Sequence, residues 1–127
     1  MAVETSTASN PLITKIVTDT DSDTTVEIAA GANAELYFVE ITNPNTVAVY
    51  TKLIASASGS SSTTQHYMQL YCPANTTCYM YVPTSVPIGS GIEFYTSTGG
   101  GIAAGQATPT EDVTVKILSL IHISEPT

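Results

Sequence analysis

The sequence has very little positive charge. It contains no arginine and only three lysines, Lys15, Lys52 and Lys116, against eleven acidic residues, so its formal net charge is −8. Binding to nucleic acid or to an anionic membrane depends on lysine and arginine side chains that neutralise phosphates. The composition therefore argues against both as partners.

Long apolar runs and targeting signals are also missing. No run approaches the roughly 18 apolar residues that a membrane-spanning helix needs. Residues 1–6 show neither the basic start nor the apolar stretch of a secretory signal. We therefore expect no membrane span and no signal peptide.

Motifs of catalysis are lacking as well. No Gly-x-Ser-x-Gly turn presents a serine nucleophile, and the glycine run 99–101 lacks the Lys-Ser/Thr of a phosphate loop. The acids are scattered rather than paired for general acid–base work. His66 has no second histidine beside it, so a polar residue at a strand entrance is the simpler interpretation. The sequence predicts no enzyme and no cofactor.

What the chain does have is β-forming residues and turn signals. Hydrophobic residues make up 43% of the chain and charged ones 11%, with valine, isoleucine and threonine prominent. Apolar and polar residues alternate over 13–17, 25–28, 36–42, 47–54, 66–72, 78–83, 92–96 and 113–117. About eight short antiparallel strands in a chain of this length predict an all-β, single-domain β-sandwich, jelly-roll-like in kind.

The domain boundaries follow from composition. Residues 1–11 are mostly small or polar and are predicted to be a flexible N-terminal arm, and residues 12–117 form the sandwich domain. Residues 118–127, Leu-Ser-Leu-Ile-His-Ile-Ser-Glu-Pro-Thr, resemble the in-frame translation of a transposase adapter used in sequencing-library preparation. That resemblance implies a non-native tail. The alternative is a further strand that continues the one before it.

A first hairpin is predicted over 36–54, with its turn at Asn43-Pro44-Asn45-Thr46. If the loop includes Val47 as well, alternation places Val39 and Ile41 on a buried face together with Val49 and Leu53. The same alternation turns Glu40 and Lys52 towards solvent.

A second hairpin is predicted over 66–83, around the turn 73–77. If Cys72 faces Cys78 across the ladder, Tyr71 pairs with Tyr79, Leu70 with Met80 and Gln69 with Tyr81. One face then collects the apolar residues Met68, Leu70, Cys72, Cys78, Met80 and Val82. The other face collects the tyrosine panel, which is Tyr67, Gln69, Tyr71, Tyr79 and Tyr81.

This hairpin supplies the main candidate site. Tyrosine offers a large, fairly rigid contact area that suits a protein interface, and its ring also stacks on sugars. The panel is therefore predicted to contact a partner protein or a glycan, unless loops or the second sheet cover the rings. Cys72 and Cys78 form either a disulfide or two small buried thiols.

Asp19, Asp21 and Asp23 have the alternate spacing of a calcium-binding loop. Thr24 stands where such a loop needs glycine, and Ala30 stands where it needs a bidentate glutamate. A solvated acidic turn is therefore the competing interpretation, and calcium is only a weak candidate ligand.

Several stretches together resemble small structural-gene proteins of marine tailed bacteriophages. They are the Met-Ala-Val-Glu-Thr start, Leu-Tyr-Phe-Val-Glu-Ile-Thr-Asn, Val-Tyr-Thr-Lys-Leu-Ile, the Gly/Ala/Thr/Pro-rich loop and the closing Val-Thr-Val-Lys-Ile, within residues 1–117. The resemblance implies a non-enzymatic virion component, such as a decoration, neck or fibre-associated protein, assembled in the host cytoplasm. Its partners would be other virion proteins or itself as a homo-oligomer, with residues 2–10 as a tether. The alternative function is a glycan-binding β-sandwich module that uses the tyrosine panel.

Overall fold

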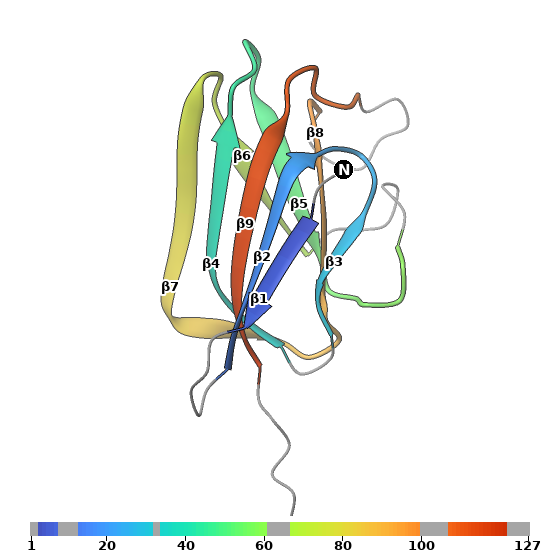
Figure 1. Ribbon diagram of the computed structural model, residues 1–127, viewed down its shortest axis with the longest axis vertical. Coiled ribbons are helices and arrows are strands. Elements are labelled where there is room, and N and C mark those ends of the chain that lie inside the picture. The colour runs from blue at the N-terminus through green and yellow to red at the C-terminus, as the bar shows by residue number, and fades with distance from the viewer. Residues whose placement is uncertain (1–2, 8–12, 32–33, 61–66, 100–106, 122–127) are drawn as a thin grey trace, which may run out of the picture.

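The computed structural model describes residues 3–7, 13–31, 34–60, 67–99 and 107–121. Within these ranges it contains no helix, and nine strands form two antiparallel sheets (Figure 1). The strands are β1 (Val3–Thr7), β2 (Ile13–Ser22), β3 (Glu27–Ala30), β4 (Ala34–Asn43), β5 (Val49–Ile54), β6 (Met68–Cys72), β7 (Thr76–Ile88), β8 (Ile92–Ser97) and β9 (Val113–Ile121). The predicted all-β sandwich is confirmed.

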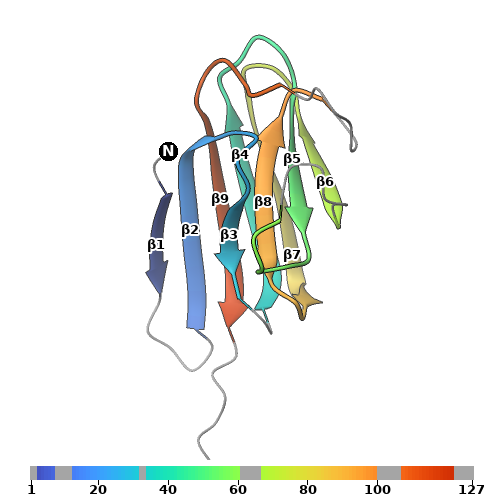
Figure 2. The same ribbon diagram turned by 90° about the vertical axis from the view of Figure 1, so that its right-hand side faces the viewer.

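The two sheets are stacked face to face (Figure 2). The five-stranded sheet has the order β1-β2-β9-β4-β7, and the four-stranded sheet has the order β3-β8-β5-β6. Four strand pairs are nested in sequence, because β5 pairs with β6, β4 with β7, β3 with β8, and β2 with β9. The chain therefore follows one long antiparallel hairpin that is wound over itself.

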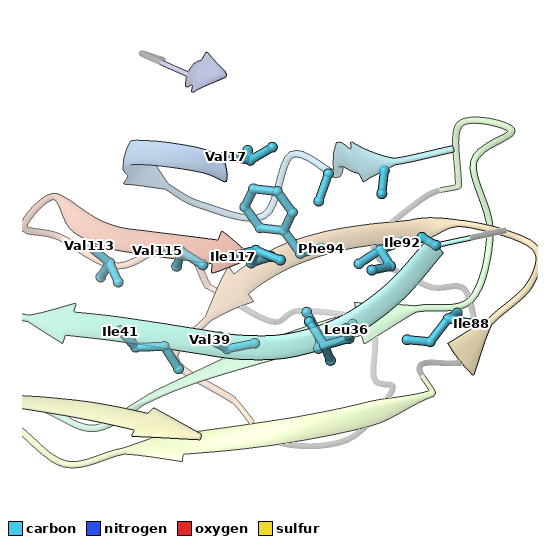
Figure 3. Close-up of a cluster of buried hydrophobic side chains, with 14 of the residues drawn as sticks. Val17, Leu36, Val39, Ile41, Ile88, Ile92, Phe94, Val113, Val115 and Ile117 are labelled. Carbon is cyan, nitrogen blue, oxygen red and sulfur yellow. The ribbon is translucent and has the colours of Figure 1, made fainter. Parts of the chain in front are cut away.

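The core lies between the sheets. Figure 3 shows aliphatic and aromatic side chains from both sheets pointing towards one another. Residues that are at most 3% exposed include Val17, Leu36, Val39, Ile41, Val49, Leu53, Phe94, Val113, Val115 and Ile117. Each large apolar side chain buried in this way stabilises the fold by about 1.5–3 kcal/mol. The predicted inward positions of β4, β5 and β9 are confirmed.

Two connections predicted to be hairpins are instead arches that cross between the sheets. The pairing of β4 with β5 and that of β6 with β7 are both wrong. β4 and β7 belong to the five-stranded sheet, and β5 and β6 belong to the four-stranded sheet. A hairpin and an arch turn the same alternate residues towards the interior, so a period of two cannot separate them.

Both ends of the domain differ from the prediction. The expected N-terminal arm contributes strand β1, in which Val3–Thr7 pair with residues 15–19 of β2. At the other end, β9 continues through Ile121, and residues 118–121 pair with both β2 and β4. Here β9 continues its alternation with the polar Ser119 buried and Leu118 only partly buried. The pairing says nothing of the origin of these residues, so the adapter-derived tail stays a prediction.

Candidate functional site

The candidate site lies where β6 and β7 end their sheets on the same side of the sandwich (Figure 2). Tyr67 is exposed just before β6, and Tyr71 projects from the outer surface of the four-stranded sheet. Tyr79 and Tyr81 project from the outer surface of the five-stranded sheet. The exposed fractions of these four tyrosines are 53%, 56%, 71% and 61% in that order. Gln69 is also exposed. The rings are accessible, so the alternative in which loops or the second sheet cover them is wrong.

The tyrosine panel is split rather than continuous. The predicted facing pairs do not form, because Tyr71 lies opposite Tyr50, and Gln69 lies opposite Lys52 on β5. On the other sheet, Tyr79 lies opposite Glu40 and Tyr81 opposite Phe38 on β4. Tyr71 on one sheet, and Tyr79 and Tyr81 on the other, therefore flank one edge of the sandwich from its two outer faces.

Neighbouring rings hold two of these tyrosines in place. The Tyr79 ring stacks on Phe38 with the ring centroids 6.2 Å apart, and the Tyr71 ring lies tilted against Tyr50 at 5.4 Å. Such aromatic pairs contribute about 0.5–1.5 kcal/mol beyond their buried area. Tyr71 and Tyr79 thus present a fixed orientation while most of each ring remains open to a ligand.

A small apolar cavity opens between the two edge strands. Its volume is about 50 Å³, and we call it the edge slot. Its lining consists of Val39, Ile41, Leu70, Tyr71, Cys78, Tyr79 and Met80. Leu70, Cys78 and Met80 pack against the core and are only partly buried. The side chains of the slot are apolar or weakly polar, which suits burial of an apolar group.

The two cysteines lie on either side of the connection between β6 and β7, and both are free thiols. The buried Cys72 sulfur is 3.3 Å from the carbonyl oxygen of Thr76 and 3.7 Å from that of Ile41, within reach of its S–H. Burial, together with hydrogen bonding and charge from the adjacent Cys78 side chain, raises the pKa of Cys72 to about 12. Cys72 is therefore protonated at neutral pH, and the disulfide stays a prediction.

Two buried asparagines, Asn43 and Asn45, which were predicted only as turn residues, fix the loops beside the edge slot. The Asn43 side-chain NH₂ donates to the carbonyl oxygens of Val47, Cys72 and Pro73, and its Oδ1 accepts from the backbone and side chain of Asn45. Asn45 in turn bonds the backbone of Glu111 in both directions. Asparagines on both sides of a proline were the available signal.

A shallow hollow of about 280 Å³ lies at this end of the sandwich. It is lined by Thr42, Asn43, Pro44, Asn75, Thr76 and Thr77. Thr42 and Thr77 are exposed and their hydroxyl groups lie 3.4 Å apart. The rim of the hollow is thus hydroxylic, next to the strand that carries Tyr79.

The weak calcium candidate finds no group of ligands among the described residues, and the competing interpretation, a solvated acidic turn, is wrong at Asp19. Asp19 and Asp21 lie within β2, and Asp19 is fully buried with its Oδ1 accepting from the Asp21 N–H at 3.1 Å. Asp23 instead accepts from the Thr25 N–H at 2.8 Å. Over the described ranges, no three acidic, histidine or cysteine side chains gather as metal ligands. His66 lies outside the described residues.

Buried Asp19 is nevertheless unusual. Its Oδ2 is buried without a hydrogen-bond partner in the part of the chain that the structure describes. Burial raises the pKa of Asp19 to about 7, with further contributions from Asp21 and Glu27. The Glu27 pKa is raised by burial and then by Asp23 and Asp21. Negative charge is thus concentrated where β2 meets β3, away from the β6–β7 edge.

The outer face of β8 is covered and is no docking surface. Lys52, predicted to reach solvent, is fully buried because its Nζ donates to Ser97 Oγ at 2.7 Å and to the Gly99 carbonyl at 2.6 Å, over the Tyr95 ring. Burial lowers the pKa of Lys52. Burial alone would raise the pKa of Glu93, but hydrogen bonds from Ser60 and from the Gly59 N–H lower it overall.

Comparison with protein families, with curated proteins and with solved structures finds no match for this chain. Over the described ranges the fold offers no helix long and apolar enough to cross a membrane. Function therefore has to be argued from the β6–β7 edge itself.

Proposed function

We propose that this protein is a non-enzymatic structural component of a tailed-bacteriophage virion. It docks on a multimeric particle as a decoration, neck or fibre-associated protein. The observation that carries the proposal is the β6–β7 edge, which has four exposed tyrosines, two of which, Tyr71 and Tyr79, line an apolar slot. Rigid aromatic rings around a small apolar pocket are the composition of an interface core.

The order of the strands supports the same proposal. In a jelly roll, a hairpin of eight strands winds so that first pairs with last and each inner pair is nested within the next. Strands β2 to β9 have these nested pairs, so we infer a jelly-roll topology with β1 added at one edge. Jelly rolls are common in viral capsid proteins and also in lectins, so the topology is compatible with a virion component and with a glycan-binding module.

Quantitative mass spectrometry of purified virions tests the proposal. We expect the protein at many copies per particle. Replacing Tyr79 and Tyr81 together by serine should remove it from particles, because the rings are exposed and their loss leaves the core intact. Ile28→Ser, at an exposed position on β3, is the matched control and should leave incorporation unchanged. Absence of the wild-type protein from virions would refute the proposal.

Glycan binding is the second candidate function. It is favoured by the hydroxyl-lined hollow beside β7, since sugar recognition combines an aromatic platform with polar side chains. On a glycan array, binding that is lost in Tyr71→Ala and Tyr79→Ala but kept in Ile28→Ser would support this candidate. A blank array at millimolar glycan would eliminate it.

A further inference from the structure

The outer edge of β7 is long, regular and available. Strand β7 pairs only with β4 among the described strands, so the backbone groups of its other side remain for a new strand. From Thr76 to Tyr81 its register with β4 is continuous, and the irregularity lies beyond Phe38. Proline lacks the N–H that a strand ladder needs, and within β7 the first proline is Pro83.

This edge lacks the usual protection against pairing. Neither β6 nor β7 contains a charged residue, whereas the edge strands on the opposite side each contain a glutamate, Glu4 in β1 and Glu27 in β3. Natural sheets place charge, proline or bulges on edges that must stay unpaired. Charge, proline and bulges are all absent over Thr76–Tyr81, which favours pairing of this edge with a further strand.

We propose that a second copy of this chain covers it, with the two β7 strands pairing antiparallel about a two-fold axis. This inference rests on the proposed docking role of the β6–β7 edge and names its partner. Side chains alternate with a period of two, so such pairing keeps inward residues beside inward residues and tyrosines beside tyrosines. The two five-stranded sheets become one ten-stranded sheet.

The chemistry of β7 matches what its own edge accepts. A strand added there must be uncharged, because each copy carries a net charge of −8 and a buried acid would find no base. It must also offer apolar groups near the slot and rings on the outer face. β7 meets both needs, with Cys78 and Met80 inward and Tyr79 and Tyr81 outward. Cross-strand aromatic pairs between the copies add specificity.

Sedimentation equilibrium of the intact chain over a range of concentrations tests the inference. We expect a dimer for the wild type. The axis is placed at Tyr79, within the regular stretch Thr76–Tyr81, so that the two copies of this residue face each other. Tyr79→Lys and Tyr79→Glu then place like charges opposite one another, and each alone should raise the dissociation constant by at least about tenfold. An equimolar mixture of the two variants should restore the dimer, because opposite charges then meet. Tyr67→Lys, at a 53% exposed position just before β6, is the control and should remain dimeric.

A monomeric wild type, a dimer that survives both Tyr79 variants, or a mixture that stays monomeric would overturn the inference. Circular dichroism identifies any variant that fails to fold, and Tyr81→Lys then replaces it.

The virion experiment distinguishes failure of self-pairing from failure of the docking role. A monomer that still enters virions, and leaves them when Tyr79 and Tyr81 become serine, retains the docking role without self-pairing. A dimer that is absent from virions retains self-pairing without the docking role.

Discussion

At the scale of single residues, Asp19 has the least favourable environment for its charge among the described residues. Its carboxyl group is fully buried, and Oδ2 has no hydrogen-bond partner in the described ranges. Burying a charge without a partner is costly, so the group takes up a proton instead. That choice makes the stability of the protein depend on pH.

Stability should fall as pH rises from about 4 to about 7. The pKa of Asp19 is 3.8 in an unfolded chain and about 7 in the folded protein, so between these values only the folded state holds the proton. Its contribution is complete below pH 4, is lost as pH rises through 7, and amounts to at most about 4 kcal/mol. Asp19→Asn should therefore flatten the dependence and stabilise the protein at pH 8.

Urea unfolding at pH 5 and pH 8 measures this difference. Asp112→Asn, at an exposed position, is the control and should change stability equally at both values. The prediction fails if Asp19→Asn shifts the free energy of unfolding by the same amount at pH 5 and pH 8.

Gly91, in the turn between β7 and β8, should tolerate no side chain. Its φ of +117° disfavours other residues, and an added Cβ would lie 2.6 Å from Ala57 Cβ and 2.9 Å from the Ala30 carbonyl oxygen. Gly91→Ala should lower the free energy of unfolding by at least about 2 kcal/mol. Gly89→Ala, in the same turn with nothing within 4 Å, should be nearly neutral. Thermal melts of both variants provide the comparison, and equal melting temperatures would contradict it.

Cys72 and Cys78 should form a disulfide on exposure to oxidised glutathione. The partly exposed Cys78 thiolate attacks glutathione disulfide and releases one glutathione thiolate. Cys72 then loses its proton, attacks the Cys78 sulfur and releases the second. The raised pKa of Cys72 makes this second step slow. The bond would stabilise the fold by only about 2 kcal/mol, because the loop that it closes is short and the stabilisation grows with loop length.

Mass spectrometry after alkylation follows this oxidation. Cys72→Ser should stop at the mixed disulfide and gain the mass of one glutathione. A wild type that also stops at this adduct, or that keeps both thiols, would show that the two sulfurs cannot bond.

At the scale of elements, alternation predicted faces correctly and partners incorrectly. Val39 and Ile41 are buried as expected, yet β4 pairs with β7 rather than with β5. The turn residues Asn43 and Pro44 signal a reversal of direction, but whether the returning strand pairs or stacks depends on contacts far along the chain. Such contacts leave no local pattern.

The candidate site was predictable to the same degree. Exposure of Tyr71 and Tyr79 followed from their alternation with core residues, whereas their division between two sheets depended on the arch. Burial of Lys52 was not predictable, because alternation along β5 turns its side chain away from the core. The groups that accept from its Nζ, Ser97 and the Gly99 carbonyl, lie far along the chain and leave no local pattern.

The arches should depend strongly on Asn43. Asn43→Ala removes the acceptor of the buried Asn45 N–H and the donor to three carbonyl oxygens. Leaving buried groups unpaired costs about 1–3 kcal/mol each, so the variant should lose about 3 kcal/mol or more in chemical denaturation. Thr46→Ala, at an exposed position in the same loop, is the control. A loss below that of Thr46→Ala would mean that the asparagine does not hold the loops together.

At the scale of the whole molecule, the nested strand pairs predict an order of folding. The innermost pair joins Leu53 to Met68, whereas the outermost joins Val17 to Ile117. Closing a short segment costs less entropy, so the β5–β6 pair should form early. Leu53→Ala should therefore slow folding, and Val17→Ala should mainly speed unfolding. Stopped-flow rates in urea decide between this order and its reverse.

The nesting also has a consequence for synthesis on the ribosome. Strand β2 emerges early, but its inner partner β9 is the last described strand to be made. Until then the apolar side chains of β2, such as Val17, and those of β4 lack the strand that lies between them. Completion of the sandwich thus waits for β9, and chains that stall before Val113 leave a gap in the sheet in which a strand of another chain can pair.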